Sequence, residues 1–592
     1  MAFNKSHIYK FSPYLITFFL ATLLFTVSLI HPFRIDADSA FQIKSVQQWL
    51  RGESSLLNAV VLPSPQDISK DVQAWTLWWS PGVPLFFLPL IAIGLPLGVA
   101  AKITVYCFFL LGCLGWLKLA YTVQCNLPTK LVIAFTLPIY SITIASVTEL
   151  IGDVIPFGIM PWLFLYTLYV SFRFQSQESN YKQTVMHSGI LGVMLGTVYW
   201  LKSSAFLVSL GIGLYLGVCL LFLKYKHSLS KRLLLLGIFT VGLLIPFISL
   251  NLLNQYLTGM NTAMAQNVEF FKPGPATQGL GLLCSFLGSI GLALFQAYGW
   301  LMHLIYFSDR VIPFFASWGP GEREIPLAIA GIPGTVVVIW LLFYSRKLYD
   351  KSVFILCCCI TFVPFLLLSY LTAKVGFNFI VHSSRYTSAF FIFTQLLLVS
   401  AYIHYYFQKN NKPAAKFLAV IILIFFFIFP NFFTVWNFAK NFVFERIGEH
   451  YITTENKLYV PVLSKVNVKS VVKQIDSVVK SPQDIVVLAL DEAAPFGAWL
   501  EIKQRTLPLV DAWGPLVQTH GTEGANLRAS SKFTTSKDLR VILVVSKSFE
   551  KDDKIPLQVK QRFPQAKDWI QVKEPKSGEA SVSIWYADLK GS

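Results

Sequence analysis

Ionisable residues stand next to the ends of several long apolar runs in this sequence. Asp36 and Asp38 come just after the first run, in "RIDADSAFQIKSVQQWLRGE", and Glu149 and Asp153 follow the third, in "SVTELIGDVIP". A carboxylate held near a membrane surface can act as a general base that takes a proton from an attacking hydroxyl or amine. Ionisable groups at such depth are costly, so their presence indicates a functional site.

Cations stand at the ends of other apolar runs. Lys202 closes the fifth run in "YWLKSSAF", Lys374 closes a later one, and His382 and Arg385 precede the tenth in "VHSSRYTSAF". Arg and Lys bind phosphate through charge-assisted hydrogen bonds, so a phosphate at the membrane surface would account for them. Acids and cations on one membrane face together suggest transfer of a group from a lipid phosphate.

Membrane-spanning helices must position these residues. Of the 592 residues, 54% are hydrophobic and 14% are charged, whereas soluble domains carry about 25% charged residues. The first run, residues 11–30, is long enough to span, and no small-residue cleavage site follows it, so we expect an uncleaved anchor. Lys5 and Lys10 precede it and favour a cytoplasmic N-terminus. Ten further spans are predicted at about 99–120, 131–147, 154–171, 185–201, 204–223, 232–253, 325–344, 352–371, 388–406 and 417–436.

The connections between these eleven spans divide by charge. The basic ones, "SFRFQSQESNYKQ", "KYKHSLSKR", "SRKLYDK" and "QKNNKPAAK", are predicted to be cytoplasmic, which places the loops at 31–82 and 254–324 and the C-terminus outside. The net charge of +18 is therefore assigned to loops that meet lipid headgroups, and no nucleic-acid partner is expected. Residues 83–98 are predicted to be re-entrant or interfacial, and residues 279–307 to form a hairpin or an in-plane helix.

The chain divides into two parts. Residues 1–440 form the membrane part, and residues 450–592 are predicted to be a small extracytoplasmic α/β domain. There "DIVVLAL", "RVILVVS" and "SVSIWYADL" are typical of strands, and "SVVKQIDSVVK" has helical spacing. This domain shows no catalytic constellation, and we interpret it as a lid or an acceptor-binding module. The eight cysteines have no spacing typical of a disulfide framework or a zinc site.

In their order, these motifs resemble the C-type (GT-C) superfamily of integral membrane glycosyltransferases, which includes the protein O-mannosyltransferases and the bacterial aminoarabinose transferase. The resemblance covers roughly residues 10–440. It lies in the acid-bearing first loop "DADSAFQIKSVQQWLRGE", the Pro-rich turn "LWWSPGVPLFFLPL", the pair Glu149 and Asp153, the single Lys202, and the pair Arg385-Tyr386. The family often has a second acid where this chain has Ser39.

The resemblance implies a polyprenyl-phosphate sugar donor and transfer on the extracytoplasmic face, with a bacterial inner membrane as the natural location. Asp38 aligns with the candidate base of the family, and Asp36 would orient it or position the acceptor. Lys202, Arg385 and His382 would hold the donor phosphate, and Glu149, Asp153 and Tyr386 would position the substrate. A divalent cation, Mg or Mn, could be held by Asp36, Asp38, Glu149 and Asp153. The sugar and the acceptor (a glycolipid, a polymer or a protein) are not indicated.

Plainer interpretations stand beside these. Asp38 could cap a helix that starts near Ala40, Asp36, Glu149 and Asp153 could be loop acids, and His382 could be an interfacial residue. Lys202 and Arg385 could extend toward lipid headgroups. The alternative functions are a lipid-linked glycan ligase or polymerase, which would rely on Arg and His in a late loop, and a lipid-sugar transporter or flippase, which would show buried mid-membrane charges and an internal repeat.

Overall fold

The fold is known from a computed structural model of the chain. The backbone is described at residues 5–30, 37–64, 66–76, 80–95, 97–139, 151–175, 180–222, 228–258, 287, 324–375, 384–409, 412–423, 451–453, 459–461, 468–489, 502–508, 518–519, 532–546, 555, 557–572 and 582–591. Several side chains inside these ranges, including those of residues 37–40, 153 and 384–391, lie outside the described set.

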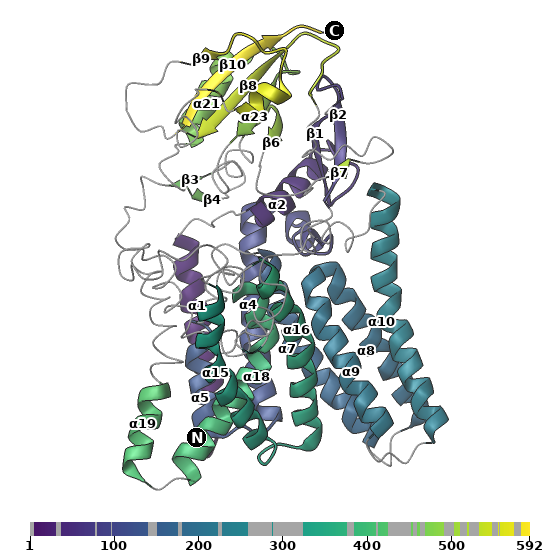
Figure 1. Ribbon diagram of the computed structural model, residues 1–592, viewed down its shortest axis with the longest axis vertical. Helices are drawn as coiled ribbons and strands as arrows, with labels where there is room; N and C mark the ends of the chain where they lie inside the picture. The colour runs from purple at the N-terminus through teal and green to yellow at the C-terminus, as the bar shows by residue number, and fades with distance from the viewer. Residues whose placement is uncertain are drawn as a thin grey trace.

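Most of the chain is a bundle of long helices (Figure 1). They are α1 (Lys5–Ile30), α4 (Leu97–Thr122), α5 (Leu127–Thr136), α7 (Ile151–Gln175), α8 (Tyr181–Leu201), α9 (Phe206–Phe222), α10 (Leu229–Thr258), α15 (Glu324–Ser345), α16 (Lys351–Val375), α18 (Ser384–Ile403) and α19 (Pro413–Leu423). A π-helical segment, His404–Lys409, continues α18.

Five of the described helices are long and apolar enough to cross a membrane: those at Val99–Thr122, Val154–Gln175, Tyr181–Leu201, Ser203–Phe222 and Leu229–Thr258. The chain is therefore described as a multi-pass membrane protein. The predicted spans at 99–120, 154–171, 185–201, 204–223 and 232–253 are confirmed as helices by these five. The total of eleven spans stays a prediction, because parts of the other runs lie outside the described residues.

Small residues let neighbouring helices approach closely. A Cβ atom on Gly242 of α10 would lie 2.7 Å from the carbonyl oxygen of Gly189 on α8, and Ser188 donates a hydrogen bond to the carbonyl of Leu235 at 2.9 Å. Further along the same two helices, Trp200 near the end of α8 donates to the carbonyl of Pro246 of α10 at 2.8 Å. Small residues at helix interfaces are typical of membrane bundles. The order of these contacts shows that α8 and α10 run parallel.

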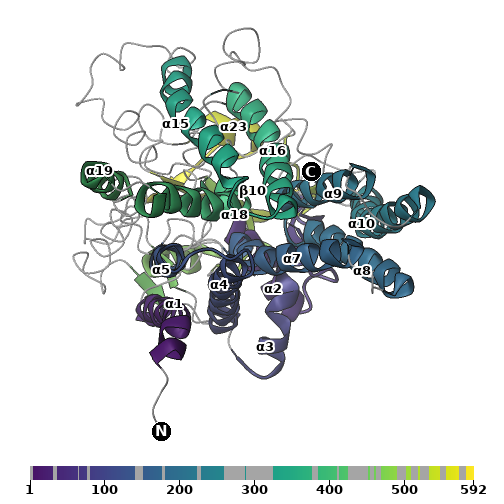
Figure 2. The same cartoon turned by 90° about the horizontal axis from the view of Figure 1, so that it is seen from below.

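Other contacts fix the remaining directions. Phe109 and Trp116 of α4 pack on Phe157 and Phe164 of α7, so these two helices are parallel. Three other helix pairs are antiparallel. Helices α1 and α4 meet at Tyr14–Tyr121 and Phe25–Tyr106, and α7 and α8 meet at Tyr166–His187 and Arg173–Gln183. Helices α9 and α16 meet at Tyr215–Ser352 and Gly211–Ile360. Figure 2 shows α7 between α4 and α8.

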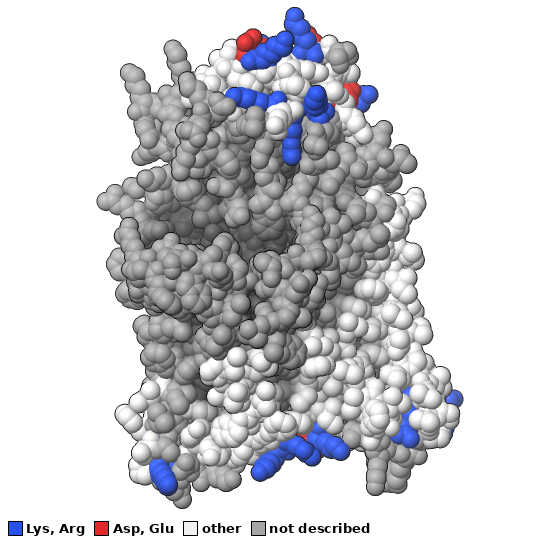
Figure 3. All heavy atoms as spheres, in the orientation of Figure 1, with Lys and Arg blue, Asp and Glu red and all other residues white. Residues whose placement is uncertain are grey.

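These directions define two ends of the bundle. At the upper end in Figure 1, helices α1, α8, α10 and α16 finish, and α4, α7, α9, α15 and α18 begin. The described residues of the four basic connections all fall at the lower end. Figure 3 shows Lys and Arg side chains at this end and a second group at the top of the molecule. Since α10 ends and α15 begins at the upper end, the connection between them starts and finishes on one side, as predicted. Its apolar piece at 279–307 lies outside the described residues, apart from Leu287.

The first loop (residues 31–82) contains α2 (Ala37–Leu50), β1 (Ala59–Pro63) and β2 (Asp71–Trp75). Strands β1 and β2 form an antiparallel hairpin that pairs Ala59 with Trp75 and that the sequence did not predict. Helix α2 begins three residues before the expected Ala40, so Asp38 is inside its first turn and Asp36 directly precedes it. The expectation that Asp38 caps this helix is therefore wrong.

The segment at 83–98 does not form a spanning helix, as predicted. It contains η1 (Pro84–Phe86) and α3 (Leu88–Ala92) before α4 begins at Leu97. A helix of five residues is far shorter than the roughly 20 residues that a bilayer requires.

The C-terminal region holds a five-stranded sheet in the order β6-β5-β8-β10-β9. Its strands are β5 (Ile485–Ala489), β6 (Arg505–Pro508), β8 (Leu539–Ser546), β9 (Ile570–Gln571) and β10 (Val582–Leu589), with helices α21 (Val468–Val478) and α23 (Leu557–Arg562). Strand β5 is parallel to β6 and β8, and β10 is antiparallel to β8. The three predicted strands and the predicted helix are confirmed.

Three further short strands lie outside this sheet. Strands β3 (Tyr451–Thr453) and β4 (Tyr459–Pro461) pair with each other, and β7 (Gln518–Thr519) pairs with β2 of the first loop. The hairpin of the first loop is therefore completed by a strand from the C-terminal region, more than 400 residues later in the chain.

Candidate functional site

The sequence predicted several residues to form a site. Those that the structure describes all lie at the upper end of the bundle. Asp38 is the second residue of α2, and Asp153 is the third residue of α7. Arg385 and Tyr386 are the second and third residues of α18, and Lys202 directly follows α8. Helix starts and ends from segments almost 350 residues apart thus share one end of the bundle.

The other predicted residues, Asp36, Glu149 and His382, lie outside the described residues. The side chains of Asp38, Asp153, Arg385 and Tyr386 do too, so for these four the structure gives the backbone position alone. The predicted Mg or Mn ligands fall in the same set. Among the described residues, no group of three or more His, Cys, Asp and Glu is placed to hold a metal ion.

The start of α2 lies against the start of α7. A Cβ atom on Gly152 would lie 3.5 Å from the side-chain nitrogen of Gln42. Gln42 follows Asp38 by four positions, so the two share one face of α2, and Gly152 directly precedes Asp153. The two acids that the sequence placed 115 positions apart therefore belong to neighbouring helix starts.

Helix α2 is buried on all sides over residues 41–48, although five of those eight residues are polar. Gln48 is satisfied by strand β1: its amide accepts from the backbone nitrogen of Val61 at 2.9 Å and donates to the Val61 carbonyl at 3.2 Å. The Oε1 atom of Gln42 is buried and accepts no hydrogen bond within the described part of the chain. A buried acceptor without a partner costs about 1–3 kcal/mol.

Lys202 stands at a break between two helices. Its backbone is extended, with φ −159° and ψ 119°, between the last residue of α8 and the 3-10 turn η2 (Ser203–Ala205). The backbone amide of Lys202 still donates to the carbonyl of Val198 at 2.9 Å. The break holds this half-buried lysine at the upper end of the bundle.

The Pro-rich turn of the first loop is attached to this same helix end. The amide of Gly82 donates to the carbonyl of Trp200 at 2.8 Å, and the hydroxyl of Ser80 donates to the carbonyl of Tyr199 at 3.3 Å. A Cβ atom on Gly82 would lie 2.7 Å from the Trp200 oxygen, so glycine permits this close approach. The turn "SPGVP" and Lys202, predicted separately, are therefore structural neighbours.

The hairpin of the first loop is also fixed to the bundle. The indole nitrogen of Trp75, at the end of β2, donates to Oδ1 of Asn254 near the end of α10 at 2.9 Å. Both residues are buried. Satisfied buried polar pairs of this kind orient the elements that carry them.

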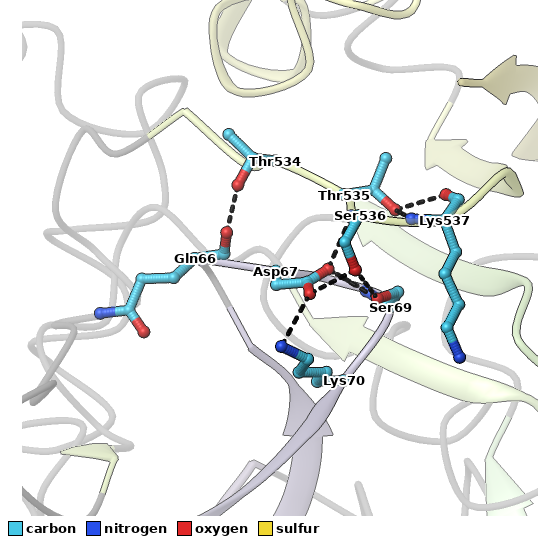
Figure 4. Close-up of polar contacts among 8 residues, drawn as sticks. All are labelled: Gln66, Asp67, Ser69, Lys70, Thr534, Thr535, Ser536 and Lys537. Carbon is cyan, nitrogen blue, oxygen red and sulfur yellow. Dashed lines mark hydrogen bonds and ion pairs between the residues drawn. The ribbon is translucent and has the colours of Figure 1, made fainter. Parts of the chain in front are cut away.

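The hairpin turn docks on the C-terminal region through Asp67 (Figure 4). The Asp67 carboxylate accepts from the amide and hydroxyl of Ser536 at 3.0 and 2.7 Å, and from the amide and hydroxyl of Ser69 at 3.1 and 2.6 Å. The Nζ atom of Lys70 lies 3.3 Å from Oδ2 of Asp67. Burial opposes ionisation, but the hydrogen bonds from Ser536 and Ser69 outweigh it and hold the pKa of Asp67 well below its usual range.

Two further contacts reinforce this docking. Ile68 is buried in the core of the C-terminal sheet, and its amide donates to the carbonyl of Thr534 at 2.8 Å. Arg505, the first residue of β6, donates to Asp71 at 2.7 Å and to the carbonyl of Gln483 at 3.1 Å. The first loop and the C-terminal region are thus joined by strand pairing, apolar burial and charged hydrogen bonds.

Sequence reasoning missed Gln42, Asp67 and Ser536. Three glutamines within seven residues of an apolar stretch, "FQIKSVQQ", give a weak signal for a buried polar helix. Nothing local distinguishes Asp67 or Ser536 from ordinary turn residues, because their roles depend on each other.

Comparisons with known proteins give similar structures but no similar sequence. No family model and no curated protein matches the chain. ArnT from Cupriavidus metallidurans bound to undecaprenyl phosphate is 12% identical with a TM-score of 0.44, over 97% of this chain and 98% of that chain. The oligosaccharyltransferase of Archaeoglobus fulgidus, tethered to an acceptor peptide, is 12% identical with a TM-score of 0.49, over 92% of this chain and 70% of that chain. With TM-scores below 0.5, we draw no residue correspondence from them.

Proposed function

We propose that this chain is a GT-C type glycosyltransferase that moves a sugar from a polyprenyl-phosphate donor to an acceptor on the extracytoplasmic face of a membrane. One observation carries the proposal: the helix ends that hold Asp38, Asp153, Lys202 and Arg385 share the upper end of the bundle. Acids and cations drawn from distant segments to one membrane face match what transfer from a lipid phosphate requires.

In this proposal Asp38 is the general base. It takes the proton of the acceptor hydroxyl or amine as that group attacks the anomeric carbon, and the bond from this carbon to the phosphate oxygen breaks. The polyprenyl phosphate leaves with the electron pair, and the displacement inverts the anomeric centre. Asp36, directly before α2, orients Asp38 or positions the acceptor.

The cations stabilise the leaving phosphate. Lys202, Arg385 and His382 lie at or next to helix ends of the upper face, where positive charge compensates the charge that develops on the departing oxygen. Glu149, Asp153 and Tyr386 position the substrate. A divalent cation, Mg or Mn, bound by the four acids is an alternative role for these carboxylates, and chelation with EDTA tests it: unchanged transfer would remove the metal from the mechanism.

The two parts of the chain have different roles in this proposal. Residues 1–440 form the catalytic membrane domain, and residues 450–592 form an extracytoplasmic domain. The contacts of Asp67, Ile68 and Arg505 support a role for the second domain in holding the first loop in place, in preference to a lid that swings freely.

The test measures the transfer of a sugar by the purified protein in lipid. Wild type, Asp38→Asn and the control Asp568→Asn, an exposed acid of the C-terminal sheet region, are incubated with radiolabelled polyprenyl-phosphate sugars and membrane extract. We expect label in an acceptor with wild type and control, and a loss of about 100-fold or more for Asp38→Asn.

The other outcomes separate the alternatives. Undiminished transfer by Asp38→Asn keeps the class of enzyme and moves the base to Asp36. Activity restricted to diphosphate-linked glycans favours a ligase or polymerase. Binding of polyprenyl phosphate without consumption of any donor favours a transporter or flippase.

A further inference from the structure

The oxygen of the Gln42 amide has no hydrogen-bond partner among the residues that the structure describes. The residue is 4% exposed, and Oε1 accepts no hydrogen bond from any residue that the structure describes. Buried polar groups in folded proteins are nearly always hydrogen-bonded, because a group that loses its hydrogen bonds to water without gaining a new partner destabilises the fold. The oxygen is available to accept a hydrogen bond from a ligand.

Gln42 is placed where a substrate would be. It stands one helical turn after Asp38 on the same face of α2, and its side chain lies against Gly152, the residue before Asp153. The absence of a side chain at Gly152 leaves room beside the amide. Gln42 therefore lies between the starts of the two helices that carry the proposed acids.

Another glutamine of the same helix shows the contrast. The amide of Gln48 is fully engaged with the backbone of Val61 in strand β1, so it holds the hairpin to α2. Gln42 and Gln48 are both buried, but the Oε1 atom of Gln48 has a structural partner.

We infer that Gln42 is a substrate-binding residue whose amide oxygen accepts a hydrogen bond from a hydroxyl group of the transferred sugar or of the acceptor, next to Asp38. This inference rests on the proposed function. A site that satisfies its own polar group only when the substrate is present discriminates against substrates that lack the hydroxyl.

The test compares Gln42→Met with Gln48→Met. Methionine has a similar size and cannot accept a strong hydrogen bond. For Gln42→Met we expect an unchanged or higher thermal unfolding midpoint, because a buried oxygen that accepts no hydrogen bond within the described residues is removed, together with about a tenfold lower kcat/KM. For Gln48→Met we expect a lower midpoint, because Val61 loses both partners.

The KM values identify the group that is bound. A raised KM for the donor with an unchanged KM for the acceptor assigns the hydroxyl to the sugar, and the reverse assigns it to the acceptor. Full transfer by Gln42→Met while wild type is active overturns the inference and leaves the proposed function intact. Absence of transfer by wild type with every donor overturns both.

A second variant covers a failure to fold. Gln42→Leu also removes the acceptor oxygen at similar size, and the same outcome is expected of it. If both variants fail to fold, Gln42 is structural and the inference is overturned.

Discussion

Asp67 of the first loop accepts two hydrogen bonds from Ser536, which lies 469 positions later in the chain, at 3.0 Å from the backbone amide and 2.7 Å from the hydroxyl. The hairpin that contains Asp67 is also tied to α2 through Gln48 and to α10 through Trp75. The C-terminal sheet is therefore connected by a continuous set of contacts to the helix that carries Asp38.

Replacing Asp67 should weaken this connection. Asp67→Ala leaves the amides and hydroxyls of Ser536 and Ser69 without their acceptor, and hydrogen bonds to a charged group contribute about 1.5–3 kcal/mol. We expect a loss of about 2 kcal/mol, measured by thermal unfolding in lipid, and a lower transfer rate because α2 is held less firmly. Asp568→Ala, at an exposed position, should change stability by less than about 0.5 kcal/mol. Equal stability of the two variants would contradict the docking role.

The contribution of Asp67 should depend on pH in the acid range alone. Its pKa is lowered in the folded protein, so its stabilising effect is fully present above the pKa of an unfolded aspartate, about 3.9, and is lost as the pH falls through the lower folded value. The difference in unfolding midpoint between wild type and Asp67→Ala should stay constant from about pH 7 to pH 5 and narrow below about pH 4. If the difference in unfolding midpoint between wild type and Asp67→Ala narrowed already near neutral pH, the pKa of Asp67 would not be lowered.

Replacing Arg505 should destabilise the protein more than replacing Asp71, although the two residues form one ion pair. Arg505→Met removes the donor to the Gln483 carbonyl as well as the partner of Asp71, and the arginine side chain is only 16% exposed. Asp71 is 42% exposed, so water replaces much of what Asp71→Asn removes. We expect the arginine variant to be the less stable one, with a coupling of about 1 kcal/mol or less in a double-mutant cycle. The reverse order would argue against the geometry described.

Two glycines of α10 should behave in opposite ways. Gly242→Ala places a Cβ atom 2.7 Å from the Gly189 carbonyl oxygen, whereas Gly237 has no atom within 4 Å of that position. We expect Gly242→Ala to destabilise by about 1–3 kcal/mol through overpacking and Gly237→Ala to stabilise by up to about 1 kcal/mol through helix propensity. Thermal unfolding in one lipid composition measures both. Similar effects would mean that α8 and α10 are not in close contact.

Variants of Lys202 distinguish a role in phosphate binding from contact with lipid headgroups. If it holds the donor phosphate, Lys202→Ala should raise the KM for the polyprenyl-phosphate donor about tenfold or more, and Lys202→Arg should retain much of the binding because the charge remains. Lys182→Ala, an exposed lysine at the lower end of the same helix, is the matched control. An unchanged KM in Lys202→Ala would assign the lysine to the lipid surface.

The sequence by itself determined where the five long spanning helices and the strands β5, β8 and β10 lie. Apolar runs of about 20 residues must form helices in a bilayer, because every backbone group needs a partner inside the segment, and "RVILVVS" had to form a buried strand by composition. The order of the runs also placed Asp38, Asp153, Lys202 and Arg385 at one end of the bundle. Helix α2 was predicted with a start three residues too late, because the difference between a cap and a first turn depends on local contacts.

Only the tertiary structure decided what surrounds these residues. The pairing of β2 with β7 and the docking of Asp67 on Ser536 involve residues that are distant in sequence, and the burial of the Gln42 side chain also depends on the fold. Local propensity carries no information on such pairs, because the free energy of each contact exists only when both partners are brought together. Turn residues such as Asp67 look alike in sequence, and their roles come from the partner that the fold supplies.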